Sequence, residues 1–139
     1  MSENYLINIH SVQVLDGKEY VVETRTTASL VGNEDDYTIK YDDQNDEGPA
    51  GKTIIRVENG NCITIDREAD ISSHMTIEKN VRHLSTHNTI AGTFTMGVSA
   101  VKIDSRINSD GGTLDFKYRT DIDMVPLAEF DFKIRLKKQ

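Results

Sequence analysis

The sequence predicts an all-β protein that closes into an antiparallel meander β-barrel of about eight to ten strands. Apolar and polar residues alternate along most of the chain, which is the two-residue period of a strand with one buried face. Turn-forming glycine, asparagine and aspartate residues separate the alternating segments. No segment of about 11 or more residues fits a helical period of 3.6 better than the strand period. These three observations define the fold class.

The alternation locates the strands. Apolar residues keep one parity within the five clearest segments, which are 20–27, 71–78, 93–100, 113–119 and 130–137. Shorter segments with the same pattern lie at 37–41, 55–57 and 63–65. Each segment is long enough for a strand of a small sheet.

The turn residues place the hairpins. Asp16-Gly17, Asn59-Gly60-Asn61 and the segment 109–112 suit tight turns, because glycine accepts a positive φ at little cost. Weaker turns are predicted at Lys79-Asn80 and at Asn88-Thr89. A break in the pattern is expected at 125–127, since proline cannot donate to a ladder.

The parity of the apolar residues changes at two places. One lies between Ile9 and Val12, and the other lies between Ala100 and Val101. A β-bulge at each place would reverse the facing and help the sheet to curl. Closure into a barrel is therefore favoured over an open sheet with bare edges, and a β-sandwich is the alternative.

The acidic tract 32–51 is the most loop-like part of the chain. A short strand at 37–41 interrupts it, and 42–51 is predicted to be an exposed, mobile loop. The segment 43–48 imitates the start of an EF-hand loop, but Ile54 stands where a bidentate glutamate is needed. We therefore expect no calcium site there.

Size and composition predict one domain covering residues 1–139. The net charge of −7 argues against a nucleic-acid partner, which would need clustered cations. The basic C-terminal residues are interpreted as a solvated strand face; they are Lys133, Arg135, Lys137 and Lys138. A single cysteine, no secretory signal and no long apolar run predict a soluble cytoplasmic protein without membrane contact.

The residues of catalytic chemistry do not form recognisable motifs. His83 and His87 would share a strand face but lie about 13 Å apart, too far to bind one zinc ion. Cys62 is expected to be an inert thiol. We predict no catalytic residues, no metal site and no cofactor.

Arginines within strands are the best candidates for a binding site. Arg25, Arg56 and Arg67 each lie in a β segment, and they are either outward surface residues or inward ligand contacts. One or two of them could point into the lumen and, with Tyr41 or Tyr118, hold an acidic group, since a guanidinium pairs well with carboxylate or phosphate. Arg67 is the strongest candidate because it shares the parity of Ile63 and Ile65.

The chain resembles the YwiB-like family of small bacterial proteins over residues 5–136. The segments that carry the resemblance are 41–43, 52–57, 63–67, 75–78, 89–96 and 111–118. The resemblance implies a calycin-like, that is lipocalin-like, closed β-barrel and no known reaction. His87 stands at a rim position where the family tends to have tyrosine, and it completes the set of candidate ligand residues.

Three functions remain open at this point. The favoured hypothesis is a non-enzymatic barrel that binds a small apolar or anionic ligand in its lumen or mouth. The second is a structural or protein-interaction module with a filled core. The third is a hydrolase that assembles histidine, aspartate and tyrosine from separate strands. The sequence does not determine the oligomeric state or whether the interior is hollow.

Overall fold

The computed structural model describes residues 5–45, 48–68, 73–89 and 92–139, and these form ten strands joined by turns. The described residues contain no helix. The strands are β1 (Tyr5–Leu15), β2 (Lys18–Gly32), β3 (Tyr37–Asn45), β4 (Gly48–Glu58), β5 (Cys62–Glu68), β6 (Ser73–Glu78), β7 (Arg82–Thr89), β8 (Gly92–Asn108), β9 (Gly111–Ile122) and β10 (Val125–Lys138).

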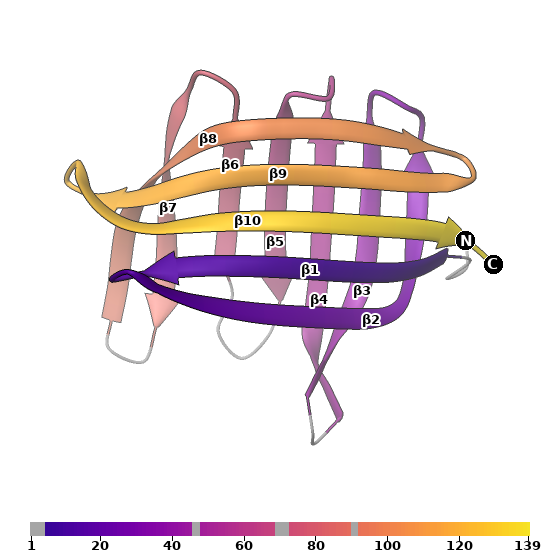
Figure 1. Cartoon of the computed structure of the whole chain (residues 1–139), viewed down its shortest axis with the longest axis horizontal. Helices are drawn as coiled ribbons and strands as arrows, with labels where there is room; N and C mark the ends of the chain where they lie inside the picture. Colours follow the sequence, from indigo (N-terminus) through magenta and orange to yellow (C-terminus); the bar gives the residue numbers. More distant parts are fainter. Residues whose placement is uncertain (1–4, 46–47, 69–72, 90–91) are drawn as a thin grey trace.

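Each strand pairs in antiparallel fashion with its neighbours in sequence, and β1 also pairs with β10. This last pairing runs over the whole of β1 and closes the barrel (Figure 1). The predicted closed meander is therefore confirmed, and the alternative of a sandwich of two separate sheets is wrong.

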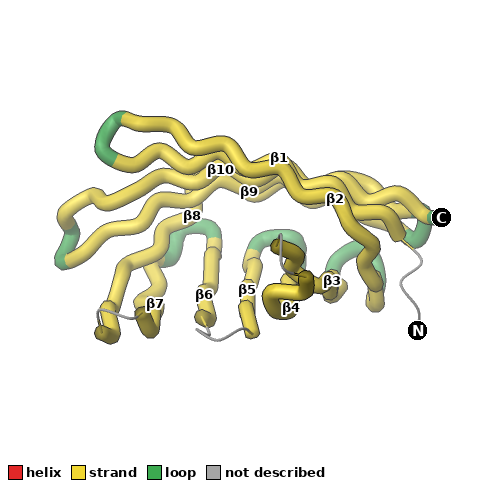
Figure 2. Tube along the Cα trace, turned by 90° about the horizontal axis from the view of Figure 1, so that it is seen from below, coloured by secondary structure: helices red, strands yellow, loops and turns green. Residues whose placement is uncertain are grey.

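The barrel is flattened into two layers whose strands cross at a steep angle (Figures 1 and 2). We call the layer of β9, β10 and β1 the front sheet and the layer of β3–β7 the back sheet. Both β2 and β8 bend and belong to both layers. The first part of β2 pairs with β1, whereas only Ala28–Gly32 pairs with β3. Likewise, β8 pairs with β7 up to Ser99 and with β9 from Gly97 onward.

One of the two predicted bulges is present. The register between β8 and β9 shifts between Ala100 and Lys102, where the parity of apolar residues changes. The bulge expected near Val12 is wrong, because β1 pairs without interruption with both neighbours. Its inner face continues from Ile9 through polar Ser11 and Gln13, so the apolar pattern changes while the backbone facing does not.

The hairpin at Asp16-Gly17 has both residues at positive φ, 53° and 74°, as a type I′ turn requires. The break expected at 125–127 is wrong. Strand β10 begins at Val125, and a register shift after Pro126 accommodates the residue that cannot donate.

Two further loop predictions need correction. Asn88 and Thr89 are paired residues of β7 and do not form a turn. Most of the segment predicted as a mobile loop at 42–51 consists of the paired ends of β3 and β4, with a register shift after Asp43. Residues 46–47, within the EF-hand-like segment, lie outside the described residues.

One end of the barrel is filled by a continuous apolar core. Its side chains interdigitate between the two sheets and are almost completely inaccessible to solvent. The largest fully buried apolar residues are Phe116, Ile7, Ile39, Ile63, Ile77, Leu114, Ile134, Val57 and Val98. The phenol of Tyr37 on β3 shares a hydrogen bond of 2.6 Å with Ser105 Oγ on β8, which ties the sheets together at this closed end.

The other end of the barrel is open. By register, Tyr20 and Val22 on β2 lie on the same face as the buried Ile7 and Ile9, yet they are 49% and 57% exposed. Phe94 lies on the inner face of β8 and is 45% exposed. Within the described residues, the first part of β2, Lys18–Thr27, pairs with β1 alone. We call this end, where inner-face residues are accessible, the mouth.

Candidate functional site

A row of polar residues crosses the inner face of the back sheet at the mouth. Tyr41, Thr53, Arg67 and Ser73 are successive register partners on four adjacent strands. Opposed residues point to the same side of a sheet, and Tyr41 and Thr53 are buried, so the row faces the interior. The backbone of His87 continues the row on β7, but its side chain lies outside the described part of the structure.

Arg67 is the central residue of this row. Its Nε donates a hydrogen bond of 3.3 Å to Oγ1 of Thr53, which is only 1% exposed. The guanidinium is nevertheless accessible to solvent, because Arg67 lies near the end of β5. The parity argument from Ile63 and Ile65 therefore gave the correct facing for Arg67.

The opposite wall carries Tyr118 on β9. Burial raises the pKa of Tyr118 far above its usual range, and the positive charge of Arg67 lowers it by a smaller amount. Arg67 and Tyr118 thus face the interior from separate sheets, and Tyr41 lies two strands from Arg67 in the same row.

Four aromatic rings stand nearly parallel on the inner face of the front sheet. Phe116 and Phe132 have centroids 5.0 Å apart, and Tyr118 and Phe130 have centroids 4.8 Å apart. Phe116 and Tyr118 are buried, whereas Phe130 and Phe132 are half-buried. The next inner-face residue on β1 opposite Phe132 is the small Ser11, so the ring stack ends toward the mouth.

A cavity of about 420 Å³ lies mainly on the outer face of the back sheet, where Ile54 and Asp66 line it, and Arg67 and Ser73 border it. Its wall also contains His74, whose Nδ1 pairs closely with a carboxylate oxygen of Asp66. Ser73 and His74 are neighbours in a strand and point to opposite faces. Among the described residues, no hydrogen bond links the imidazole of His74 to a hydroxyl group, so this pair does not form the nucleophile–base arrangement of a hydrolase.

The other two arginines lie outside the lumen. Arg56 is exposed and alternates with the inward Ile55 and Val57 on β4. Arg25 is exposed on β2 and is the register partner of the outward Asn8. Of the three arginines considered from the sequence, only Arg67 points inward.

Sequence reasoning missed three contributors to the mouth, which are Thr53, Phe130 and Phe132. Phe130 and Phe132 alternate with charged residues on β10 and were assigned simply to a core face. Their position at the accessible end of the stack depends on the pairing with β1, which alternation alone does not reveal. Thr53 has the parity of Ile55, and that signal could have identified it.

Other reactive groups do not gather at one place. In the described part of the chain, no three histidine, cysteine, aspartate or glutamate side chains are arranged to hold a metal ion. Burial and the negative charges of Glu78 and Glu58 raise the pKa of the Cys62 thiol. None of the described residues belongs to a helix that is long and apolar enough to span a bilayer.

Comparison with known proteins agrees with this architecture. A family model described as "Domain of unknown function (DUF1934)" matches residues 7–134. The crystal structure of the ywiB protein from Bacillus subtilis superposes with a TM-score of 0.81 at 18% identity, covering 97% of this chain and 91% of that one. No curated protein matches the chain. The resemblance to the YwiB-like family is confirmed.

Proposed function

The chain belongs to the DUF1934 family of domains of unknown function, and from the geometry of its mouth we propose that it is a non-enzymatic cytoplasmic protein that binds a small anionic molecule with a flat apolar body. The anionic group pairs with Arg67, and the apolar body lies against the exposed end of the aromatic stack. Cytoplasmic location is part of the proposal and is supported by the single, unbridged cysteine.

The observation that carries the proposal is an arginine on the inner face of a barrel that remains accessible to solvent. A charged residue at an inner position costs several kcal/mol when it is fully buried. At the mouth, Arg67 is accessible to solvent, and its guanidinium has the planar geometry that matches a carboxylate or phosphate. Its hydrogen bond to buried Thr53 holds the guanidinium in position before a ligand arrives.

The shape of the neighbouring wall favours a flat ligand. Phe130 and Phe132 present half-buried rings at the end of an ordered stack. On the other side of β1, Val22 exposes apolar surface across Ser11, and Tyr20 does so across Gln13. Covering this surface removes apolar area from water, and a parallel aromatic contact adds about 0.5–1.5 kcal/mol. An aromatic carboxylate combines both features.

A binding assay with matched variants tests the proposal. We would measure the thermal stabilisation of the protein by a panel of aromatic carboxylates, their uncharged amides and aliphatic carboxylates. Arg67→Gln should weaken binding of the best aromatic carboxylate by about tenfold or more, as expected for loss of a charge-assisted hydrogen bond. Arg56→Gln is the control, because it removes the same charge from the outer face of the adjacent strand β4.

Two results would overturn the proposal. One is a panel in which no member shifts the melting temperature. The other is binding that Arg67→Gln and Arg56→Gln weaken equally, since only a non-specific charge effect would then be at work.

A second candidate function is pairing with another protein strand. It is supported by the edge of β2 at Lys18–Thr27, which in the described residues has β1 as its sole partner and also carries exposed Val21. Such an edge is a template for strand addition. Sedimentation over a wide concentration range tests the self-pairing form, and a monomer throughout would exclude it.

A further inference from the structure

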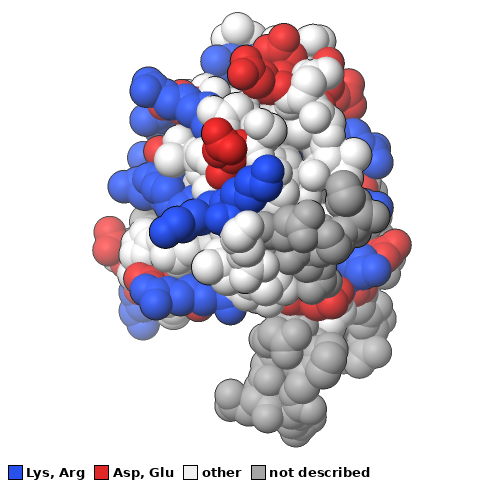
Figure 3. All heavy atoms as spheres, turned by 90° about the vertical axis from the view of Figure 1, so that its right-hand side faces the viewer, with Lys and Arg blue, Asp and Glu red and all other residues white. Residues whose placement is uncertain are grey.

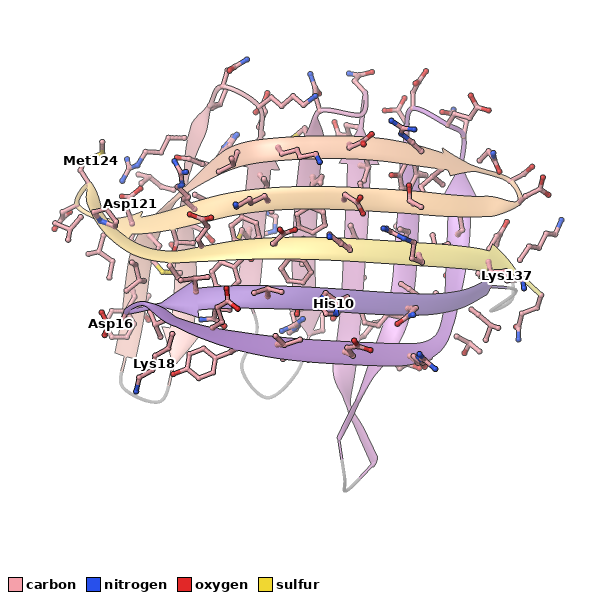
Figure 4. All side chains as sticks on the ribbon, viewed as in Figure 1. His10, Asp16, Lys18, Asp121, Met124 and Lys137 are labelled. Atoms are coloured by element: carbon pink, nitrogen blue, oxygen red, sulfur yellow. The ribbon has the colours of Figure 1, made fainter. Side chains whose placement is uncertain are left out.

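The outer face of the front sheet contains a groove, on the opposite side of that sheet from the barrel interior. It has a volume of about 550 Å³ and crosses β2, β1 and β10. Figure 3 views the molecule from the end where Lys137 lies (Figure 4), and lysine and arginine side chains gather along the side formed by the front sheet. The groove includes Arg25 and Arg135, which come from strands on either side of β1.

The register of the three strands explains the hollow. Asn8 on β1 is the partner of both Arg25 and Arg135, so a short side chain lies between two long ones. In the adjacent row, Leu6 lies between Thr27 and Lys137. The core side chains of Ile7 and Leu136 are buried, so these residues meet the groove with their main chain. The groove therefore has a main-chain floor, cationic walls and one exposed leucine.

The charges around the groove are arranged for an anion. Arg25, Arg135 and Lys137 line it, and no carboxylate does. Among the described residues, Arg25 and Lys137 have no acidic partner, whereas one nitrogen of Arg135 bonds Asp115 at 2.6 Å. Strands two apart are separated by about 10 Å, a span over which two arginine side chains can converge on one phosphate.

A polar group under the groove lacks a partner. The Oδ1 atom of Asn8 is buried and accepts no hydrogen bond from the protein. An amide oxygen in this state costs about 1–3 kcal/mol, which a donor supplied by a ligand hydroxyl would recover after a small side-chain rotation. This is independent of the cationic walls and points to an occupant with a hydrogen-bond donor, which the P–OH group of a singly protonated phosphate monoester supplies.

We propose that this groove binds the phosphate group of a small, soluble phosphoester, with Arg25, Arg135 and Lys137 as the phosphate contacts and Leu6 beneath the apolar part of the ester. The volume suits a molecule of that size. A lipid headgroup in a membrane fits less well, because the neighbouring outer row carries Glu23 and Asp115 and the whole chain has a charge of −7. The site is separate from the mouth, so either can fail without the other.

The test uses phenyl phosphate as the probe, with inorganic phosphate and phenol as its separate halves. Titration followed by amide chemical shifts in the full-length protein should perturb residues around Asn8, and it should do so equally in the Arg67→Gln variant, which lacks the anion contact at the mouth. Arg25→Gln and Lys137→Gln should each weaken phenyl phosphate binding by about tenfold. Lys133→Gln is the control, because it removes the same charge from the same strand outside the groove.

Each other outcome overturns the assignment. If phenol binds as tightly as phenyl phosphate, the phosphate group has no role in recognition. Equal weakening by Lys133→Gln and Arg25→Gln would reduce the effect to net charge. Capture by anionic phospholipid vesicles without binding of phenyl phosphate would assign the groove to a membrane surface. Shifts confined to the mouth and abolished by Arg67→Gln would transfer the phosphate to the site of the proposed function.

Discussion

Replacing Val57 by alanine should destabilise the barrel far more than the same replacement of Val22, although both valines lie on the inner face. Val57 is fully buried at the closed end, so the change loses about 1.6 kcal/mol of transfer free energy for its two lost carbon groups. A residual cavity of about 50 Å³ adds roughly 1.2 kcal/mol. The expected loss in unfolding free energy is therefore about 3 kcal/mol.

Val22 is already 57% exposed and borders the mouth, so its replacement loses less than half of the transfer term, about 0.7 kcal/mol, and leaves no closed cavity. For a chain of 139 residues the entropy of unfolding is about 0.3 kcal/mol per degree. The melting temperature should fall by about 10 °C for Val57→Ala and by about 2 °C for Val22→Ala.

Urea unfolding followed by far-ultraviolet circular dichroism measures both free energies. Strand propensity differs between the edge segment of β2 and the central strand β4 by at most about 1 kcal/mol, which is less than the expected difference of about 2 kcal/mol between the variants. Equal destabilisation would mean that Val22 is packed as tightly as Val57 in solution. The barrel would then be closed at both ends, and the reasoning about the mouth would be refuted.

Three further predictions concern other parts of the molecule. Met124 has φ 71° in the β9–β10 turn and is highly exposed, so Met124→Gly should raise the unfolding free energy by up to about 1 kcal/mol in urea titrations, and a loss would contradict the strain. Hydrogen bonds from Arg82 to Asp121, and from Lys117 and Arg119 to Glu129, lower the pKa of each carboxyl. The unfolded carboxyls bind protons at a higher pH than the folded ones, so the ion pairs stabilise the fold fully above about pH 5, and this stabilisation is lost as the pH falls through the lowered pKa values. Asp121→Asn should therefore flatten the acid side of a plot of unfolding free energy against pH, and an unchanged plot would refute the linkage. The raised pKa of Cys62 predicts slower alkylation by iodoacetamide at pH 7.5 than that of a free model thiol, and faster reaction would show an activated cysteine.

Much of the fold could be predicted because strand alternation and turn chemistry are local properties. Asp16-Gly17 formed its hairpin because aspartate and glycine tolerate the φ values of that turn. The Asp123-Met124 turn was missed because methionine carries no such signal, and only the tightness of the hairpin imposes its conformation. Proline in β10 was misleading for a similar reason, since a bulge absorbs it.

The site could be predicted only in part, because facing is local but accessibility is not. The shared parity with Ile63 and Ile65 was enough to predict that Arg67 faces the interior. Arg25 has the same parity as Glu23, which indicates an outward side chain. The adjacent valines of β2 lie on both faces, however, so the alternation in this segment does not show which face is buried. Nothing in the alternation of Val22 distinguishes it from Val57, because their exposure depends on where a third strand stops pairing.

The polar residues at inner positions do, however, record where the barrel opens. Ser11 and Gln13 continue the inner face of β1 after Ile9, and Arg67 ends the inner face of β5 after Ile65. A barrel closed at both ends would bury the guanidinium of Arg67 at a cost of several kcal/mol, which its hydrogen bond to the neutral hydroxyl of Thr53 would not by itself offset. The same residues are tolerated at an open end, where water reaches them. Loss of apolar character along an inner parity is therefore the sequence feature from which the mouth could have been located, and the position of Arg67 makes physical sense only if that end admits water or a ligand.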